Sequence, residues 1–591
     1  MGAGSPLAPS LPSVTRVKRA HAAKNGAEVL LDHLESQGVD CIFASPIAVM
    51  APIWEVVARR GNEMRLRYFR CRHELLAVSL ASGYYKATGR SQIVFLPTSL
   101  GVQNASMALS TALQERTPMT ALSPDTLSYG DDPDGDPGAE WPALLTDHAG
   151  PARNGEVVVK WAKRARTPSD LVHELRRARF IAESVPLGPT LLEIPFQLLM
   201  GEGHPEVPAW VSPAPVVATA EQIDLVAELL VGATNPIIIT EHGGRTDDER
   251  EALVCIAETL SAPVFEFWNP AYHNFPRSHP LYGAGPVEAV LGDADAILLA
   301  GCNGAWHPPQ TVLRPGCAVI HLEQDPLRPR GAYWGYPTTE AVAGDLSLNL
   351  AALAASVRTR SAVVIALMRS PSRPQATERW AGHGHRVRAK GVGDARQLSS
   401  RATDFVPAPV LFSELHDALP EGTICVDEIM SQMPQMIQFL YARKPFQQYR
   451  GWAGALGTGL GTALGVKLAR PQQVVVCILG DGAWHYNPAP AALGFAQEYG
   501  VPLLIVLCNN RQYASQTRNL VKYHPDSAAV REQNFVGNVI EPTPDYVKQA
   551  EAYGGTGERV QKPDELSAAL QRALEAVASG QTFLLDVVVN P

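Results

Sequence analysis

The residues with the clearest chemical pattern are Asp481 and Asn510, each of which follows a buried, strand-like stretch. Asp481 lies in a Gly-Asp-Gly turn after the apolar residues 474–479, and Asn510 comes after a second apolar stretch, 502–508. A helix-like stretch, 488–499, connects the two. Strand, crossover helix and parallel strand form a right-handed unit whose strands end at the same edge of the sheet. We therefore expect Asp481 and Asn510 to lie close together at that edge.

The chemistry that these two residues favour is the binding of a metal ion and a phosphate. Carboxylate and amide oxygens are hard ligands, and Mg²⁺ takes its remaining ligands from water and phosphates. The small residues Gly482 and Ala483 leave backbone N–H groups open to an anion at the start of the connecting helix. The alternative is an ordinary turn with an Asx cap, but the flanking strands and helix favour a Mg²⁺–diphosphate site.

The whole segment resembles the thiamine diphosphate (ThDP) motif of the superfamily that contains acetolactate synthase, pyruvate decarboxylase and benzoylformate decarboxylase. The resemblance implies that the side chains of Asp481 and Asn510 and the backbone carbonyl of Gln512 bind Mg²⁺. It also implies that the turn starting at Gly480 contacts the diphosphate of the cofactor. The span is longer than is usual in that family because of the insertion-like sequence HYNPAP, which changes the loop beside the diphosphate.

A second segment, 68–109, is similar to the signature of the first domain in that family. By resemblance, Glu74 is the carboxylate that binds N1′ of the aminopyrimidine of ThDP, and His73 lines the reaction centre. The imino group of the cofactor removes the C2 proton, and a carboxyl at N1′ stabilises the tautomer that does so. As ordinary residues, Glu74 would favour the dipole of a first helical turn, and His73 would be a packed side chain.

A third segment, 451–471, is similar to the residues that precede the Gly-Asp-Gly motif in the family. By resemblance, Leu456 holds the cofactor bent, which brings the imino nitrogen close to C2. Gly457 fits a close approach of the backbone. Ser431 and Gln432 follow a strand-like stretch and lie where the family contacts the diphosphate. A core position for Leu456, and capping of the next helix by Ser431 or Gln432, are the alternatives.

The substrate contacts are expected among polar residues near these motifs, although each could be an ordinary loop or interface residue: Gln114, His485, Tyr513 and Gln516. Pyruvate decarboxylases carry a histidine pair in the loop that corresponds to 123–138, and a glutamate after the Asn-Asn pair. This chain has Pro124-Asp125 and Gln516 at those places. Both differences argue against simple decarboxylation that relies on that set of acids.

The elements that must position these residues form three α/β blocks. Alternating strands and helices imply parallel sheets, so we expect an α/β fold of three doubly wound domains with mostly parallel sheets. By resemblance, these are a pyrimidine-binding domain (26–200), a central domain (218–357) and a diphosphate-binding domain (406–591). We expect a flexible arm at residues 1–25 and a linker at residues 358–405. The sequence does not decide whether the first and third blocks share one architecture.

The central block gives little support for a nucleotide. Acetolactate synthases usually have a run like Arg-Phe-Asp-Asp-Arg after a strand of this domain, whereas this chain has GCNGAWHPPQT at 301–311. FAD binding is therefore doubtful. Trp306, His307 and the stretch 267–275 could line a substrate channel, but packing between domains is the default interpretation.

Length and composition restrict the class of protein. A chain of 591 residues exceeds what one core supports, and 46% hydrophobic with 18% charged residues is typical of globular proteins. The net charge of −9 gives no case for nucleic acid. Eight scattered cysteines without a CxxC pair favour a reducing cytoplasm. No stretch is apolar enough for a membrane span, and the N-terminus lacks the core of a signal peptide.

These features together predict a ThDP- and Mg²⁺-dependent enzyme that makes or breaks a C–C bond next to a carbonyl. By resemblance, a 2-keto acid reacts with the C2 ylide of ThDP and loses CO₂, which leaves an enamine. Attack on a second carbonyl, as in acetolactate synthase, is favoured over protonation because the decarboxylase acids are missing. A simple decarboxylase, a 2-hydroxyacyl-CoA lyase and a catalytically quiet ThDP-binding subunit stay as alternatives. Glu74 and Asp481 should meet across a subunit interface, which predicts a homodimer or homotetramer.

Overall fold

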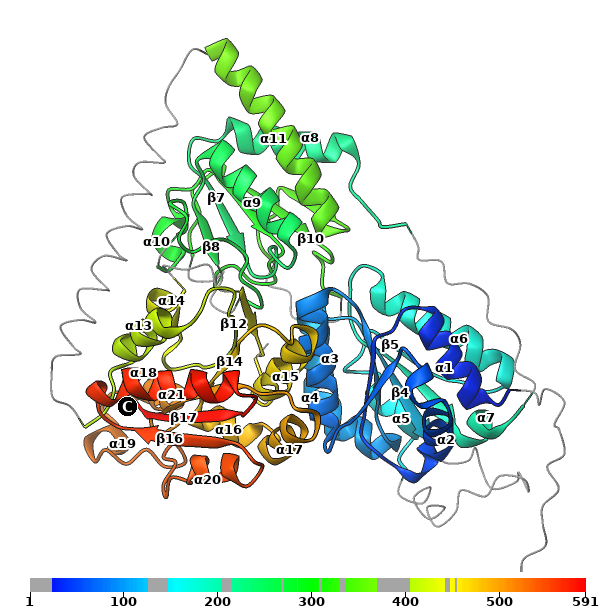
Figure 1. Ribbon diagram of the computed structural model, residues 1–591. Coiled ribbons are helices and arrows are strands. Elements are labelled where there is room, and N and C mark those ends of the chain that lie inside the picture. Colours follow the sequence, from blue (N-terminus) through cyan, green and yellow to red (C-terminus); the bar gives the residue numbers. More distant parts are fainter. Residues whose placement is uncertain are drawn as a thin grey trace, which may run out of the picture.

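Three parallel sheets, each packed with helices, form three lobes that meet near the centre of the molecule (Figure 1). The computed structural model describes residues 24–125, 147–202, 214–266, 270–283, 285–307, 311–329, 331, 335–368, 404–441, 447–451 and 454–590. The expected fold class, three α/β domains with parallel sheets, is confirmed. In the described parts of the chain, no helix is both long and apolar enough to cross a membrane.

The first lobe contains a six-stranded sheet in the order β2-β1-β3-β4-β6-β5, with all neighbours parallel. Its first helix begins at a capping box, in which Asn25 accepts from the backbone of Glu28 and Glu28 accepts from that of Asn25. The strands are β1 (Cys41–Ala44), β2 (Arg67–Arg70), β3 (Gln92–Phe95), β4 (Met119–Asp125), β5 (Trp161–Arg164) and β6 (Thr190–Pro195). The α-helices are α1 (Gly26–Ser36), α2 (Ala51–Arg60), α3 (Glu74–Thr88), α4 (Thr98–Gln114), α5 (Gly150–Gly155), α6 (Pro168–Glu183) and α7 (Phe196–Met200).

The central lobe contains a five-stranded parallel sheet in the order β11-β10-β9-β7-β8. Four of its strands match the apolar stretches of the sequence, and the fifth, at the edge, is half exposed. The strands are β7 (Pro236–Thr240), β8 (Val264–Glu266), β9 (Ala296–Ala300), β10 (Ala318–Glu323) and β11 (Glu340–Ala343). The helices are α8 (Ala220–Gly232), α9 (Asp247–Leu260), α10 (Glu288–Leu291) and α11 (Leu346–Met368). Helix α11 extends into residues 358–368, which the sequence assigned to a linker, because SAVVIALM continues the helix-forming sequence.

The third lobe contains a six-stranded parallel sheet in the order β13-β12-β14-β15-β17-β16. The strands are β12 (Ile424–Glu428), β13 (Gln447–Arg450), β14 (Val475–Gly480), β15 (Leu504–Asn509), β16 (Thr556–Val560) and β17 (Phe583–Val588). The helices are α13 (Ala408–Ala418), α14 (Met433–Phe439), α15 (Gly459–Ala469), α16 (Asp481–Tyr486), α17 (Ala489–Tyr499), α18 (Ala514–Tyr523), α19 (Ala528–Arg531), α20 (Tyr546–Glu551) and α21 (Leu566–Ala578). In chain order, this arrangement of strands is the same as in the first lobe. The two lobes therefore share one architecture, which the sequence had left open.

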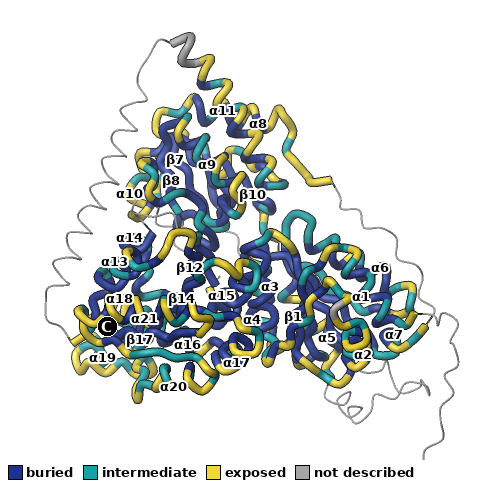
Figure 2. The backbone as a smooth tube through the Cα atoms, viewed as in Figure 1, coloured by how far each residue is buried: buried dark blue, intermediate teal, exposed yellow. Residues whose placement is uncertain are grey.

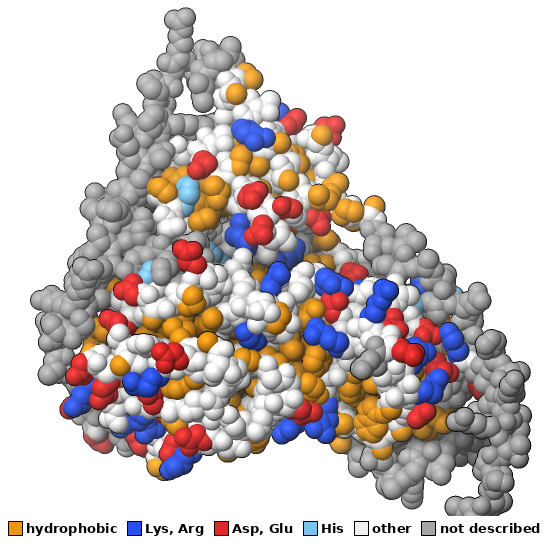
Figure 3. Space-filling view, in the orientation of Figure 1, with side chains coloured by type: hydrophobic (Ala, Val, Ile, Leu, Met, Phe, Trp, Pro, Cys, Tyr) orange, Lys and Arg blue, Asp and Glu red, His pale blue; other side chains and the backbone are white. Residues whose placement is uncertain are grey.

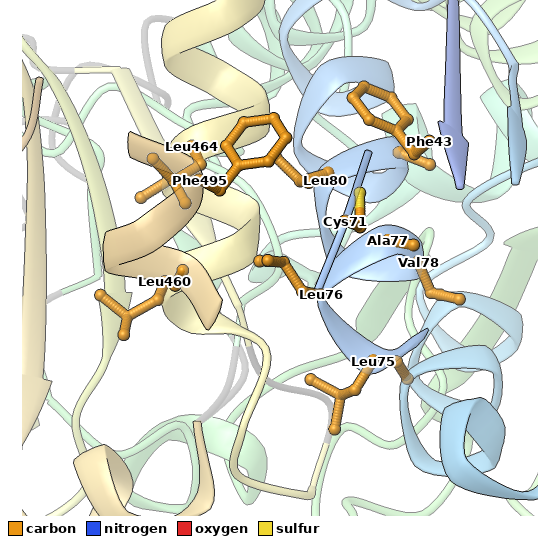
Figure 4. Close-up of a cluster of buried hydrophobic side chains, with 14 of the residues drawn as sticks. Phe43, Cys71, Leu75, Leu76, Ala77, Val78, Leu80, Leu460, Leu464 and Phe495 are labelled. Atoms are coloured by element: carbon orange, nitrogen blue, oxygen red, sulfur yellow. The ribbon is translucent and has the colours of Figure 1, made fainter. Parts of the chain in front are cut away.

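The first and third lobes pack through helices α3 and α15, which are buried along most of their length (Figure 2). Leu76 and Leu80 of α3 lie against Leu460 and Leu464 of α15 and Phe495 of α17 in one apolar cluster (Figure 4). This cluster joins the two lobes into one continuous core.

Glycines allow the two helices to approach closely. A Cβ added at Gly83 would collide with the backbone of Thr462, and one added at Gly465 would collide with that of Leu80. The backbones of α3 and α15 therefore touch at positions where any larger side chain would separate them.

The three lobes meet around the buried Lys86 of α3. Its ammonium group lies 2.7 Å from the carboxylate of Glu115, donates to the carbonyl of Arg450 in β13, and faces the ring of Tyr272 from the central lobe. The backbone of His273 donates to the carbonyl of Gln448 at 3.2 Å. The described part of the stretch 267–275 thus packs between domains, as the default interpretation had it, whereas residues 267–269 lie outside the described residues.

Two other expectations need correction or refinement. Pro124 and Asp125, which the sequence assigned to a loop near the reaction centre, belong to strand β4, where Asp125 is 3.4 Å from Arg164. The rest of that loop, 126–138, lies outside the described residues. Trp306 packs on Tyr336 inside the central lobe, with ring centroids 4.7 Å apart, so it is a core residue.

Charged side chains of both signs are interspersed over all three lobes on the face shown in Figure 3, and hydrophobic side chains gather over the third lobe and its junction with the first.

Candidate functional site

A cavity of about 410 Å³ lies at the carboxyl edge of the third sheet, beside the ends of β12, β14 and β15. Parallel sheets commonly bind ligands at this edge. The cavity is lined by Met107, Glu428, Met430, Ser431, Gln432, Gly454, Ala455, Leu456, Gly480, Asp481, Gly482, Ala483, Tyr486, Cys508, Asn510, Gln512, Tyr513, Ala514, Ser515 and Gln516. Most of the residues that the sequence selected therefore face one cavity.

Asp481 is buried at the end of β14, where it starts helix α16. Its Oδ1 accepts a hydrogen bond from the backbone N–H of Gly482 at 2.9 Å. Its Oδ2 is buried without a hydrogen-bond partner among the described residues. Burial raises the pKa of Asp481 to about 6. A buried carboxylate oxygen without a donor costs free energy, and a cation in the adjoining cavity would compensate that cost.

Asn510 and Gln512 lie opposite Asp481 in the turn after β15. Arg511 between them has a φ of 56°, in the left-handed region. The Oδ1 of Asn510 accepts from the N–H of Gln512 at 3.3 Å. A carboxylate, an amide oxygen and a backbone carbonyl around one cavity fit the ligand preference of Mg²⁺. In the described residues, no group of three or more His, Cys, Asp or Glu side chains could hold a metal ion, so amide and carbonyl oxygens would have to complete this set.

The Gly-Asp-Gly turn leaves room for a ligand on one side and is closed on the other. A Cβ added at Gly480 would meet no atom within 4 Å, so open space lies over this residue. A Cβ added at Gly482 would lie 2.7 Å from the ring of Tyr513, which covers that side. The turn thus presents its backbone to the cavity, as phosphate binding requires.

Leu456 reaches the cavity from the loop before α15. The next residue, Gly457, has a φ of 124°, and an added Cβ would lie 2.7 Å from the carbonyl of Tyr486 and 2.9 Å from Met107. A residue with a side chain would therefore be both strained and too large at this position. Met107 belongs to α4 and is the lining residue that the first lobe contributes among those described.

Glu428 is a buried carboxylate in the cavity wall to which the sequence assigned no role. Its Oε1 accepts from the N–H groups of Gly457 (2.7 Å) and Thr458 (3.0 Å), and its Oε2 accepts from Nδ2 of Asn487 (2.5 Å). Burial raises the pKa of Glu428 to about 7, although these hydrogen bonds favour the ionised form. The sequence feature that could have identified Glu428 as a cavity residue is its place at the end of a buried strand, at the same edge of the sheet as Asp481.

Asn487 belongs to the sequence HYNPAP, which forms the junction between helices α16 and α17. Pro488 and Pro490 lack an N–H group, so one continuous helix cannot run through this junction. The Nδ2 of Asn487 also donates to the carbonyl of Ala483 at 2.9 Å, and its Oδ1 accepts from the N–H of Leu460 at 3.0 Å. The insertion-like sequence thus supplies a buried amide beside the cavity.

Ser431 and Gln432 both line the cavity, between β12 and α14. Gln432 occupies the N-cap position of α14, but its side chain makes no capping hydrogen bond. The carbonyl of Ser431 accepts from Arg518 at 3.3 Å. The side chain of Gln432 therefore does not have the capping role that was its alternative.

The candidate substrate contacts divide into two groups. Tyr513 and Gln516 line the cavity, and the ring of Tyr513 packs edge-on against that of Tyr486. His485 and Gln114 are absent from the lining residues. His485 is 3.3 Å from the hydroxyl of Tyr546, and Gln114 is exposed at the end of α4.

Glu74 starts helix α3 and lies outside the cavity that the same chain forms around Asp481. Its carboxylate accepts from the hydroxyl of Ser45 at 2.8 Å and from Nδ2 of Asn104 at 2.5 Å. His73 caps the helix, because its Nδ1 accepts from the N–H of Leu75 at 3.1 Å. The described residues of one chain therefore present two separate candidate half-sites, one around Glu74 and one around Asp481.

Comparison with known proteins assigns all three lobes to one family. Three family models match: the N-terminal TPP binding domain of thiamine pyrophosphate enzymes over residues 24–136, their central domain over 223–353, and their C-terminal TPP binding domain over 430–587. Thiamine pyrophosphate is another name for ThDP.

Curated relatives match over nearly the whole chain. Acetolactate synthase isozyme 3 large subunit of Escherichia coli (strain K12) is 26% identical, with 96% of this chain and 95% of the relative covered. Sulfoacetaldehyde acetyltransferase of Rhodobacter capsulatus is 25% identical, with coverage of 95% and 94%.

Solved structures share the fold. The ThDP-dependent 4-hydroxybenzoylformate decarboxylase of Rhodococcus jostii RHA1 superposes with a TM-score of 0.77 at 23% identity, covering 96% of this chain and 99% of that one. Benzoylformate decarboxylase from Polynucleobacter necessarius superposes with a TM-score of 0.75 at 20% identity, with coverage of 96% and 99%. With three matching domain models in the same order as the three lobes, this chain belongs to the thiamine pyrophosphate enzyme family.

Proposed function

We propose that this protein is a ThDP- and Mg²⁺-dependent enzyme that cleaves a 2-keto acid next to its carbonyl and transfers the fragment to a second carbonyl compound. When bound, ThDP supplies the nucleophilic carbon and the electron sink for this chemistry. The observation that carries the proposal is the buried Oδ2 of Asp481, which has no hydrogen-bond partner among the described residues and lies in the same cavity as Asn510, open at the Gly-Asp-Gly turn.

The residues of the third lobe divide the work of holding the cofactor. Asp481, Asn510 and the carbonyl of Gln512 would bind Mg²⁺. The turn at Gly480, with Gly482 and Ala483, would face the diphosphate, as would the polar side chains of Ser431 and Gln432. Leu456 would pack against the organic part of the cofactor, and the next residue, Gly457, lies too close to Tyr486 and Met107 to carry a side chain.

Glu74 would hold a proton at the aminopyrimidine of a cofactor bound by a second subunit. Ser45 and Asn104 fix its carboxylate, and His73 fixes the start of its helix. Large apolar side chains are exposed beside both half-sites, with Leu100 56% and Tyr486 58% exposed. Such residues are typical of surfaces that a partner covers, so we propose a homodimer or homotetramer with sites at the interface.

Transfer to a second carbonyl is favoured over protonation because the cavity wall offers few acids. Its carboxyl groups, among the described lining residues, are Asp481 and Glu428. Asp481 is assigned to the metal, and Glu428 is engaged by three hydrogen bonds. Gln516 stands where pyruvate decarboxylases have a glutamate. The named activity of the acetolactate synthase relative supports the same choice.

Simple decarboxylation is the second candidate, because two structural neighbours are aryl keto acid decarboxylases. A 2-hydroxyacyl-CoA lyase is a third reading, and a quiet ThDP-binding subunit is the non-enzyme alternative. FAD stays unsupported, and the compartment is proposed to be the cytoplasm.

The test is to add ThDP and Mg²⁺ to the apo-protein with aliphatic and aromatic 2-keto acids, following CO₂ and products by mass spectrometry. A hydroxyketone or acetolactate-type product would establish transfer and identify the donor. CO₂ with free aldehyde would instead establish decarboxylation. Tight ThDP binding without turnover of any acid would identify a quiet subunit.

A further inference from the structure

We propose that Glu428 and Asn487 act as a positioning pair that fixes the loop carrying Leu456 beside the cofactor site. The inference rests on the proposed function, because Leu456 is the residue expected to support the cofactor. It assigns a role to two buried polar side chains that neither the metal site nor the substrate wall requires.

The pair joins three segments of the cavity wall. Glu428 ends β12 and leads into the segment with Ser431, and it binds the loop before α15. Asn487 follows the helix that starts at Asp481 and binds the first turn of α15. Across these segments, the distance from Nδ2 of Asn487 to Oε2 of Glu428 is 2.5 Å. Both side chains are buried, at 1% and 6% exposure, so water does not compete for these hydrogen bonds.

The loop that follows Leu456 depends on this pair for its backbone hydrogen bonds. The N–H groups at the start of a helix have no partner inside the helix and need an acceptor from elsewhere. Glu428 accepts from Gly457 and Thr458, and Asn487 accepts from Leu460. The first of these donors is the residue next to Leu456, so any shift of the carboxylate would move Leu456 directly.

The neighbouring Asp427 offers a matched comparison. Successive residues of a strand face opposite sides of the sheet, and Asp427 is equally buried on the other side. It accepts from Arg450 at 2.9 Å and from Gln448 at 2.5 Å, and it does not line the cavity. Loss of Asp427 should therefore weaken the fold without loosening the loop at Leu456.

The decisive variants change the pair without changing its size. In Glu428→Gln, the new amide has one acceptor oxygen, so it cannot accept from both the loop and Asn487. Either its NH₂ group faces the Nδ2 donor of Asn487, or it faces the N–H groups of the loop, which then lose their acceptor. Asn487→Asp alone places a second carboxylate against Glu428 and provides an independent disruption if the first variant folds poorly. Combining the two substitutions returns one donor and one acceptor to the pair. Asp427→Asn is the control.

Hydrogen–deuterium exchange of the apo-protein, read on peptides covering 454–460, tests the positioning without any cofactor. We expect each single variant to exchange about tenfold faster there, as expected for loss of about one hydrogen bond. The double variant should recover part of the protection, and Asp427→Asn should match the wild type in this segment. Exchange at the wild-type rate in both single variants would overturn the inference.

The same proteins loaded with ThDP and Mg²⁺ connect the loop to the cofactor. The rate of C2-proton exchange of bound ThDP, measured by quenched-flow NMR, should fall about tenfold in Glu428→Gln and recover in the double variant. An unchanged rate in Glu428→Gln would refute a role in positioning. If the wild type itself bound no ThDP, the proposed function would fail, whereas the peptide exchange would still decide whether the pair holds the loop.

Discussion

Asp481 is the residue on which the proposed metal site depends, because it combines a buried carboxylate with an oxygen that has no donor among the described residues. We expect Asp481→Asn to weaken Mg²⁺-dependent binding of ThDP by more than about tenfold, since even residues around the ligands of a metal commonly contribute that much. Calorimetric titration of ThDP at fixed Mg²⁺ would measure the change. The control is Asp526→Asn. This substitution changes an exposed carboxylate that does not line the cavity, so it should leave the affinity for ThDP unaltered. Equal affinities for wild type and Asp481→Asn would contradict the metal site.

A second prediction for a single residue concerns Glu428 and the pH dependence of stability. Its pKa is raised from 4.5 to about 7 by burial, so the folded state binds the proton more tightly than the unfolded state. The stabilisation is fully present below pH 4.5 and is lost as the pH rises through about 7. We expect the apo wild type to lose roughly 3 kcal/mol of stability from this group over that range.

Glu428→Gln should remove that dependence, because an amide does not titrate. Urea denaturation of both apo-proteins at several pH values would compare the two slopes. Parallel curves for the wild type and the variant between pH 5 and 7 would show that Glu428 does not titrate in this range.

At the scale of elements, the close contact of α3 with α15 determines how the first and third lobes fit together. Gly465→Ala should lower the stability by about 3 kcal/mol, because the new methyl group collides with the backbone of Leu80 and cannot be relieved by rotating a side chain. The midpoint of thermal unfolding would report the loss.

The matched control for this substitution is Gly232→Ala, at the end of α8. An added Cβ there meets no atom within 4 Å, and alanine favours the helix, so stability should stay constant or rise slightly. A similar loss in both variants would contradict the prediction, because the loss at Gly465 could then not be assigned to the contact between the lobes.

At the scale of the whole molecule, the separation of Glu74 from Asp481 predicts that one site needs two chains. Subunits carrying Glu74→Ala and subunits carrying Asp481→Ala should each be inactive, because each variant lacks one half-site. Mixed dimers should regain up to about half of the wild-type activity, since one of the two interface sites then has both residues intact.

Tagged heterodimers purified from co-expression would provide the mixed species, and dimers with the same substitution on both chains would be the control. Verified heterodimers without activity would exclude a site shared between subunits. They would leave the metal assignment untouched, because that rests on the third lobe alone.

Much of this molecule could be read from local sequence. The buried strands on either side of Asp481 and Asn510, and the helix between them, follow from apolar periodicity, and their parallel pairing follows from the crossover connection. The order of the three α/β blocks and the family also follow from segments that are contiguous in the chain. Within the turn, however, the short helix α16 was not expected, because two prolines divide what would otherwise be one helix.

What the tertiary structure decided concerns contacts between distant segments. Met107 lies more than three hundred residues from the other cavity residues, and no local pattern links Glu428 to Asn487. The resemblance placed Pro124-Asp125 in a loop near the reaction centre, but pairing with β6 holds both residues in a strand. The types of residue that bind ligands are thus determined locally, whereas the packing of whole lobes determines which of them share a cavity.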